Sequence, residues 1–309
     1  MTELKGVMAL TYSALNPDYS LNENGICQEI DWVLAQGAAG IWPGGYAANW
    51  PELTEEQKKQ LLRISIEHAR GQTYFAAGCH ATNTLETIRL VNYAETLGYD
   101  CAWISPTLPR KSTDAEIIRH HRMVMENTSM PVAIYDSSPI TNYLSPRLIG
   151  EIVALSERIV AMKAIIGDIG HIAGLHNGSI DRQVSIFGIE SNMLEHLMLG
   201  SPGGMGGSEW IPILCALHRA FSAGDMRRAW SLQKTILAQC PLILPRAASQ
   251  AMGGHAAHSG IGYMKEKFRQ ISGIDLGSPM PPHEAASADE IVKARADIEA
   301  LQRAVREVT

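Results

Sequence analysis

A lysine in an apolar segment is the first candidate for chemistry in this sequence. Lys163 lies in the run RIVAMKAIIGD (158–168), whose only other charged residues are its two ends. Burial of an ammonium group lowers its pKa and populates the nucleophilic amine, and a fall of roughly three units from about 10.4 would bring it near neutrality. The alternative is a lysine that ends an edge strand and reaches water. For Lys163 considered alone, this alternative is the better explanation.

Tyr135 is the candidate partner of this lysine. It ends the apolar run PVAIYD (131–136), one expected strand before Lys163. Neighbouring parallel strands lie about 4.8 Å apart, so two inward-facing side chains at matched height come within hydrogen-bond reach. A phenol beside an amine suits imine chemistry, in which the lysine attacks a ketone and the tyrosine transfers protons. Taken alone, Tyr135 is better explained as a core aromatic residue whose hydroxyl bonds to the backbone.

Two glycine-containing segments could contact a substrate. The segment 44–49 (GGYAAN) offers backbone N–H groups that could hold a carboxylate, or it forms a flexible turn. The segment Gly203–Ser208 (GGMGGS) is expected to form a loop after the eighth strand, where many barrels bind phosphate. No lysine or arginine flanks it, so space for substrate bulk, or a plain loop, is favoured over a phosphate site.

The histidines do not predict a metal site. His120 and His121 fall in a helical pattern, where adjacent residues point in different directions. His255 and His258 lie in a glycine- and alanine-rich segment without a carboxylate nearby. We expect surface or hydrogen-bonded histidines, and no bound metal.

The candidate residues fall within a repeated alternation of strands and helices. Eight strand–helix units follow one another at a spacing of about 25–30 residues, which predicts a (β/α)₈ barrel, the TIM-barrel form of the α/β class. An open doubly wound sheet is the rival, but no G-x-G-x-x-G follows the first strand. The expected strands are Gly6–Ser13, Gly40–Gly45, Thr73–Cys79, Cys101–Pro106, Pro131–Asp136, Ile159–Ile166 and Val184–Gly188, with Gly203–Ser208 in the eighth unit. Helices are expected at Glu23–Gln36, from Thr54, at Thr84–Leu97, from Asp114, at Ser145–Leu155, from Asp168, at Asn192–Leu199 and at Ile211–Ala223.

The alternation stops after residue 223, which divides the chain into two expected parts. Residues 1–223 form the barrel, and residues 224–309 form a helical C-terminal extension packed on it. Four helices are expected in this extension, at Asp225–Gln239, Leu244–Met252, Gly262–Ser272 and Ala288–Glu307.

The composition excludes several classes of protein. The 309 residues are 46% hydrophobic, with a mean hydropathy of −0.05, and no apolar run approaches the ~20 residues of a membrane span. The net charge is −6 and the basic residues are dispersed, so no nucleic-acid partner is expected. Five scattered cysteines, without C-x-x-C spacing, and an N-terminus without a signal pattern favour a cytoplasmic protein.

With Lys163 and Tyr135 placed, the whole chain resembles the dihydrodipicolinate synthase / N-acetylneuraminate lyase family of class I, Schiff-base aldolases. The similarity rests on the order and spacing of several short motifs. These are Gly6-Val7 with Thr11, the segment 45–54 at the place of G-T-T-G-E-F-P-T-L-S, Ala76-Ala77-Gly78 with Asn83-Thr84, Ile134-Tyr135-Asp136, Met162-Lys163-Ala164 with Gly167-Asp168, and Ser278-Pro279-Met280-Pro281.

The resemblance implies an imine between Lys163 and a 2-oxo acid, usually pyruvate or a derivative, with Tyr135 as general acid and base. It also implies a homotetramer built as a dimer of dimers. No cofactor is needed, because the protonated imine itself is the electron sink. The positions that the resemblance assigns to substrate binding are Gly45, Tyr46, Ala47, Ile165, Gly188, Glu190 and Ser208.

The chain also departs from the family's pattern. Tyr46-Ala47 replaces the two hydroxyl residues that hold the pyruvate carboxylate, and Ala48-Asn49 replaces Gly-Glu. The synthases' second tyrosine is absent from Pro106–Leu108, and their arginine is absent from the segment 137–141 (SSPIT). These differences argue against dihydrodipicolinate synthase activity in lysine biosynthesis.

We therefore expect a lyase or aldolase that cleaves or condenses a 2-oxo acid with an aldehyde through Lys163. Two alternatives stay open. One is dehydration or hydration of a 2-keto-3-deoxy acid through the same imine. The other is a catalytically silent paralogue that binds a 2-oxo acid.

Overall fold

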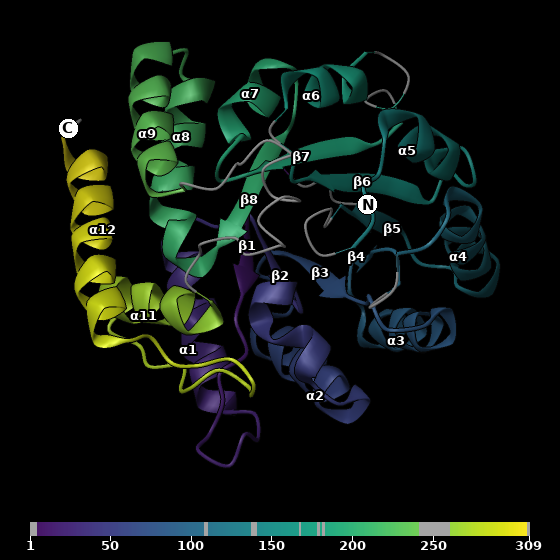
Figure 1. Cartoon of the computed structure of the whole chain (residues 1–309), viewed down its shortest axis with the longest axis horizontal. Helices are drawn as coiled ribbons and strands as arrows, with labels where there is room; N and C mark the ends of the chain where they lie inside the picture. Colours follow the sequence, from purple (N-terminus) through teal and green to yellow (C-terminus); the bar gives the residue numbers. More distant parts are fainter. Residues whose placement is uncertain are drawn as a thin grey trace.

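Eight parallel strands close into a barrel surrounded by helices, as expected from the sequence (Figure 1). The computed structural model describes residues 5–107, 111–136, 141–166, 168–177, 180, 183–240 and 260–307. Neighbouring strands pair in chain order, and β1 pairs with β8 to complete the ring. The strands are β1 (Gly6–Thr11), β2 (Gly40–Pro43), β3 (Tyr74–Gly78), β4 (Cys101–Ile104), β5 (Val132–Tyr135), β6 (Ile159–Ala164), β7 (Ser185–Ile189) and β8 (Gly203–Gly207).

Helices α1 to α6 each begin at a residue whose side chain caps the helix. The hydroxyl of Thr54 accepts from the backbone of Gln57, whose side chain accepts from the backbone of Thr54. Asp168 caps the helix after Lys163 by accepting from the backbone of His171. The helices are α1 (Glu23–Ala35), α2 (Glu55–Ala69), α3 (Thr84–Leu97), α4 (Asp114–Asn127), α5 (Pro146–Val153), α6 (Ile169–Leu175), α7 (Met193–Met198) and α8 (Ile211–Ser222).

Further helices follow the barrel and pack on α8 or on one another. They are α9 (Met226–Gln239), α11 (Ile261–Ser272) and α12 (Ala288–Arg306). Helix α9 lies against α8, and α12 runs alongside both, while α11 packs against α12 (Figure 1). The expected helix 244–252, together with His255 and His258, lies outside the described residues. No helix in the described part of the chain has the length and apolar character needed to cross a membrane.

Side chains from the strands fill two separate cores. Ile134 and Met162 point outward and belong to the large core between the strands and the helices. The inward-facing residues form a second core inside the barrel, where the rings of Trp42 and Trp103 stack with centroids 4.8 Å apart. Tyr135 belongs to this inner core, so the barrel interior brings it into contact with large aromatic rings.

The glycine-rich segment 203–208 differs from the expectation drawn from the sequence. It is not a loop after the eighth strand, because Gly203–Gly207 is the eighth strand itself. A Cβ on Gly203 would lie 1.7 Å from the carbonyl oxygen of Gly6, so β1 and β8 pair closely only with glycine there. Glycine has low strand propensity, which is why the sequence pattern hides this strand.

Candidate active site

Lys163 and Tyr135 are direct partners in the ladder between β5 and β6. The Nζ atom of Lys163 lies 4.6 Å from the centroid of the Tyr135 ring and 5.4 Å from that of Trp42. Lys163 is only 5% exposed, and its strand pairs with β5 on one side and β7 on the other. Lys163 therefore does not reach water from an edge strand, and it faces the aromatic interior of the barrel.

Burial sets the protonation states of both side chains. It lowers the pKa of Lys163 to about 8, although the charges of Glu190 and Asp136 oppose this shift. Roughly a tenth of the lysine is then free amine at pH 7. Burial raises the pKa of Tyr135 well above its usual range, with a further contribution from Tyr46, so its phenol stays protonated. The pair combines a reactive amine with a proton donor.

The turn after β2 contributes Tyr46 to this cluster. Gly45 precedes a short 3₁₀ helix, Tyr46–Ala48, of which Ala47 is the middle residue. The ring of Tyr46 lies 5.1 Å from that of Tyr135, and its hydroxyl is 3.0 Å from the hydroxyl of Ser105. The Tyr46 hydroxyl therefore already has a hydrogen-bond partner.

Asn49 fixes the end of the same turn. It is fully buried and adopts the left-handed conformation, with φ of 58°. Its side-chain oxygen accepts from the backbone of Met280, which ties the turn to the segment between α11 and α12. These contacts favour a structured turn over a flexible one.

His80 belongs to the cluster although the sequence pattern did not single it out. It lies two residues beyond β3 and is 1% exposed. Its ring centroid is 4.5 Å from that of Tyr46 and 5.2 Å from that of Tyr135. The signal that could have found it is the alternation of sides along a strand, which continues from Ala76 through Gly78 to His80.

Glu190 places a carboxylate near the lysine. It follows β7, and its backbone carbonyl accepts from Gln233 at 2.9 Å. Burial raises the pKa of its carboxyl group, whereas the charges of Lys163 and Lys267 lower it. The carboxylate thus interacts with two ammonium groups.

Three other residues assigned to substrate binding have different surroundings. The hydroxyl of Ser208 donates to Glu29 at 2.6 Å, in a buried contact with α1. A Cβ on Gly188 would lie 2.8 Å from His196 and 2.9 Å from the Asn192 side chain, so this position faces α7. Ile165 lies one residue beyond β6 and is partly exposed. Their roles in binding stay predictions, but neither the Ser208 hydroxyl nor the Gly188 side-chain position faces Lys163.

A buried carboxylate network surrounds Ser208. Glu29 accepts from the backbone of Tyr12 at 2.9 Å, and the Tyr12 hydroxyl donates to Glu209. Burial raises the pKa of Glu29 to about 8 and that of Glu209 to about 7. The network joins α1, β1 and the start of the segment after β8.

The described residues contain no group of three or more histidine, cysteine, aspartate or glutamate side chains able to hold a metal ion. Of the two expected states, surface or hydrogen-bonded, His120 and His121 show the second, because both are buried. They bond to Thr84 (3.0 Å) and to the carbonyl of Ile117 (2.8 Å), respectively. Both side chains pack within the helical layer of the barrel.

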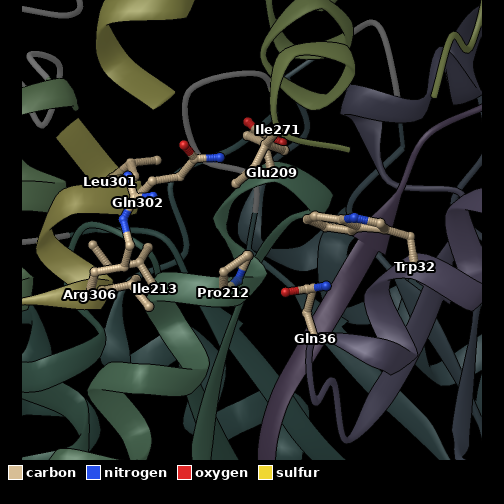
Figure 2. A pocket seen from close by; sticks show the side chains of 10 residues that line it. Trp32, Gln36, Glu209, Pro212, Ile213, Ile271, Leu301, Gln302 and Arg306 are labelled. Carbon is tan, nitrogen blue, oxygen red and sulfur yellow. The ribbon is translucent and has the colours of Figure 1, made fainter. Parts of the chain in front are cut away.

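A cavity of about 300 Å³ lies apart from this cluster, between α1, α8, α11 and α12 (Figure 2). Its lining includes none of Lys163, Tyr135, Tyr46 or His80. The lining residues are Trp32, Gln36, Glu209, Pro212, Ile213, Ile271, Leu301, Gln302, Val305 and Arg306.

The sequence pattern of the dihydrodipicolinate synthetase family matches residues 3–261. The chain belongs to this family. An uncharacterised DapA-like lyase of Thermococcus onnurineus is 27% identical over 232 residues, which are 74% of this chain and 79% of that protein. A 4-hydroxy-tetrahydrodipicolinate synthase of Brucella suis is 25% identical over 295 residues, which are 93% of this chain and 96% of that protein.

The crystal structure of YagE, a prophage protein of the same family from Escherichia coli K12 in complex with pyruvate, has the same fold. It superposes with a TM-score of 0.86 at 19% identity, covering 96% of this chain and 98% of YagE. The family match and the relative named as a lyase together show that the protein is a lyase of the dihydrodipicolinate synthetase family. Its substrate does not follow from membership.

Proposed function

We propose that the protein cleaves or condenses a 2-oxo acid of the pyruvate type with an aldehyde, through an imine on Lys163. The observation that carries the proposal is the pairing of Lys163 with Tyr135 inside the barrel, with the Nζ atom 4.6 Å from the phenol ring centroid. A lysine with a pKa of about 8 supplies free amine at neutral pH.

In the cleavage direction, the amine of Lys163 attacks the ketone of the substrate and water leaves. The bond between C3 and C4 of the substrate, next to the imine carbon C2, then breaks. Its electron pair flows into the protonated imine to give an enamine. The hydroxyl that becomes the aldehyde loses its proton in this step. Tyr135 donates its phenol proton to the departing water and, as phenolate, takes up the proton of the hydroxyl when the carbon–carbon bond breaks. Burial favours the return to the protonated phenol.

Exchange of the methyl protons of pyruvate in D₂O tests this proposal. Enamine formation at Lys163 replaces these protons by deuterium, which proton NMR follows directly. Exchange that is lost in Lys163→Ala supports the imine. No exchange with pyruvate or with longer 2-oxo acids contradicts it and favours a silent paralogue.

Product analysis then separates the two catalytic readings. A 4-hydroxy-2-oxo acid gives an aldehyde and pyruvate in a retro-aldol reaction. A 2-keto-3-deoxy acid that loses water instead gives a dehydrated oxo acid through the same imine. We favour the first reaction, as in the sequence-based prediction, and the second is the alternative outcome.

Assembly and location belong to the same proposal. We propose a homotetramer in the cytoplasm, with no nucleic-acid or membrane partner. All five cysteines are unpaired, which suits a reducing compartment. Analytical ultracentrifugation would test the oligomeric state.

A further inference from the structure

His80 carries two polar atoms that nothing in the described structure satisfies. The residue is 1% exposed, and neither Nδ1 nor Nε2 has a hydrogen-bond partner among the described residues. Buried polar side-chain atoms usually have a partner, which can be a water molecule or a ligand. The backbone carbonyl of His80 accepts from the indole of Trp50 at 2.8 Å, so the residue itself is well anchored.

The unsatisfied imidazole lies beside the candidate catalytic residues. Gly78 pairs with Trp103 on β4, and the backbone of Cys79 continues this ladder with a 2.9 Å bond to the Trp103 carbonyl. Alternation along the strand puts His80 on the interior side, as its ring contact with Tyr135 at 5.2 Å shows. His80 thus lies just beyond the carboxyl end of β3, against the ring of Tyr135.

The surrounding charge favours an anion next to this imidazole. Burial and the positive charges of Lys58 and Lys163 hold the pKa of His80 well below its usual range. The imidazole is therefore neutral, with one nitrogen as donor and the other as acceptor. Lys58 is already paired with Glu86 at 2.9 Å, so the positive charge that attracts a negatively charged ligand group is that of Lys163 or of its protonated imine.

We propose that His80 binds the carboxylate of the 2-oxo acid, with one ring N–H donating a hydrogen bond to a carboxylate oxygen. This inference rests on the proposed imine function, because it places the carboxylate next to Lys163. The neighbouring turn does not supply a free hydroxyl, since the Tyr46 hydroxyl is 3.0 Å from that of Ser105. His80 offers a buried side-chain N–H to a carboxylate at this place.

The test compares a ketone that carries a carboxylate with one that does not. Pyruvate and acetone are each titrated against the protein, the imine on Lys163 is reduced with borohydride, and the adduct is quantified by mass spectrometry. His80→Phe keeps an aromatic ring against Tyr46 and Tyr135 but removes both nitrogens. His80→Gln keeps an N–H donor without the ring.

For His80→Phe, we expect the half-saturating pyruvate concentration to rise about 10- to 100-fold, the worth of a hydrogen bond to a charged group. The half-saturating acetone concentration should change less than about threefold. His80→Gln should recover part of the pyruvate affinity. An unchanged pyruvate titration in His80→Phe overturns the inference. So does an equal loss for pyruvate and acetone, which would place the effect on the lysine or on the fold.

A measurement on the unmodified protein keeps the inference testable if His80→Phe does not fold. The side-chain nitrogen signals of His80 in ¹⁵N NMR should shift more with pyruvate than with acetone, because both ketones form the imine but only pyruvate brings a carboxylate. Signals that respond no more to pyruvate than to acetone overturn the inference. If the wild-type protein forms an adduct while His80 is unaffected, only the His80 assignment fails. If neither ketone forms an adduct, the imine function fails and this inference with it.

Discussion

Tyr135 and Lys163 are paired across the β5–β6 ladder, so the phenol ring lies against the amine at 4.6 Å from its centroid to Nζ. This arrangement depends on backbone register, because a shift of one residue in either strand would send one of the two side chains into the outer core. Their outward-facing neighbours Ile134 and Met162 belong to that core and hold the register. The packing of the outer core therefore sets the relative position of Tyr135 and Lys163.

Replacement of Tyr135 by phenylalanine should slow turnover while leaving the imine intact. We expect a fall of about 10²–10⁴-fold in kcat, the usual contribution of a positioned acid or base. The phenylalanine ring preserves contact with Trp42, whose centroid lies 4.7 Å from that of Tyr135, so the fold should persist. Steady-state kinetics check the rate, and borohydride trapping checks the imine. A variant with full activity would remove Tyr135 from the mechanism.

The rate of imine formation should depend on pH through Lys163. The free amine reacts and the ammonium form does not, so the observed rate constant should rise as pH increases and level off above a pKa of about 8. Compared with an ordinary lysine pKa of 10.5, this shift increases the free amine at pH 7 on the order of 300-fold. Stopped-flow trapping with pyruvate between pH 6 and pH 10 measures the profile. A midpoint above pH 10 would contradict the assignment.

The same shift predicts how stability depends on pH. Folding lowers the pKa of Lys163, so protonation of this lysine favours the unfolded chain. The resulting loss of folding stability grows as pH falls below about 10.5 and reaches its full size below about 8. Lys163→Met should therefore be more stable than the wild type by roughly 3 kcal/mol at pH 7. The difference should shrink to about 1 kcal/mol at pH 10. Urea unfolding at both pH values provides the comparison, and an equal difference at both would refute the prediction.

Much of the barrel could be predicted from the alternation of strands and helices, but exact strand ends could not. The apolar run around Lys163 extends to Ile166, whereas pairing stops at Ala164. Hydrophobicity does not fix where pairing stops, because Ile165 and Ile166 are apolar but only partly buried, and they lie beyond the last ladder pair. For β8 the sequence pattern misses the strand itself, because its glycines pair as a strand without the residue types that favour strands.

The candidate site could be predicted only where local spacing decided it. Lys163 and Tyr135 lie at matched positions in the consecutive strands β5 and β6, so their side chains share one height inside the barrel. Ser208 could not be assigned in this way, since its hydroxyl bonds to Glu29 from the far end of the sequence. His80 lies beyond the end of its strand. The sequence alone does not show that the alternation of sides continues that far, but the bond from Cys79 to Trp103 does.

Glu29 offers a test of the network that holds Ser208. Its pKa of about 8 means that the carboxyl group is mostly protonated at pH 7, so Glu29→Gln should change the free energy of unfolding by less than about 1 kcal/mol. Glu29→Ala leaves the backbone N–H of Tyr12 and the Ser208 hydroxyl without an acceptor and should cost about 2–4 kcal/mol. Denaturant titrations at pH 7 compare the two variants. Similar losses in both would show that the network is not held by these hydrogen bonds.

Borohydride trapping with pyruvate shows whether Lys163 itself forms the imine. The protein is incubated with pyruvate, reduced with borohydride, digested and mapped by mass spectrometry, with Lys163→Ala as control. The prediction is a single adduct on the peptide containing Lys163, absent from the variant although its thermal unfolding stays cooperative. An adduct on another lysine, such as the buried Lys265 or Lys267, would contradict the account, as would no adduct with any 2-oxo acid.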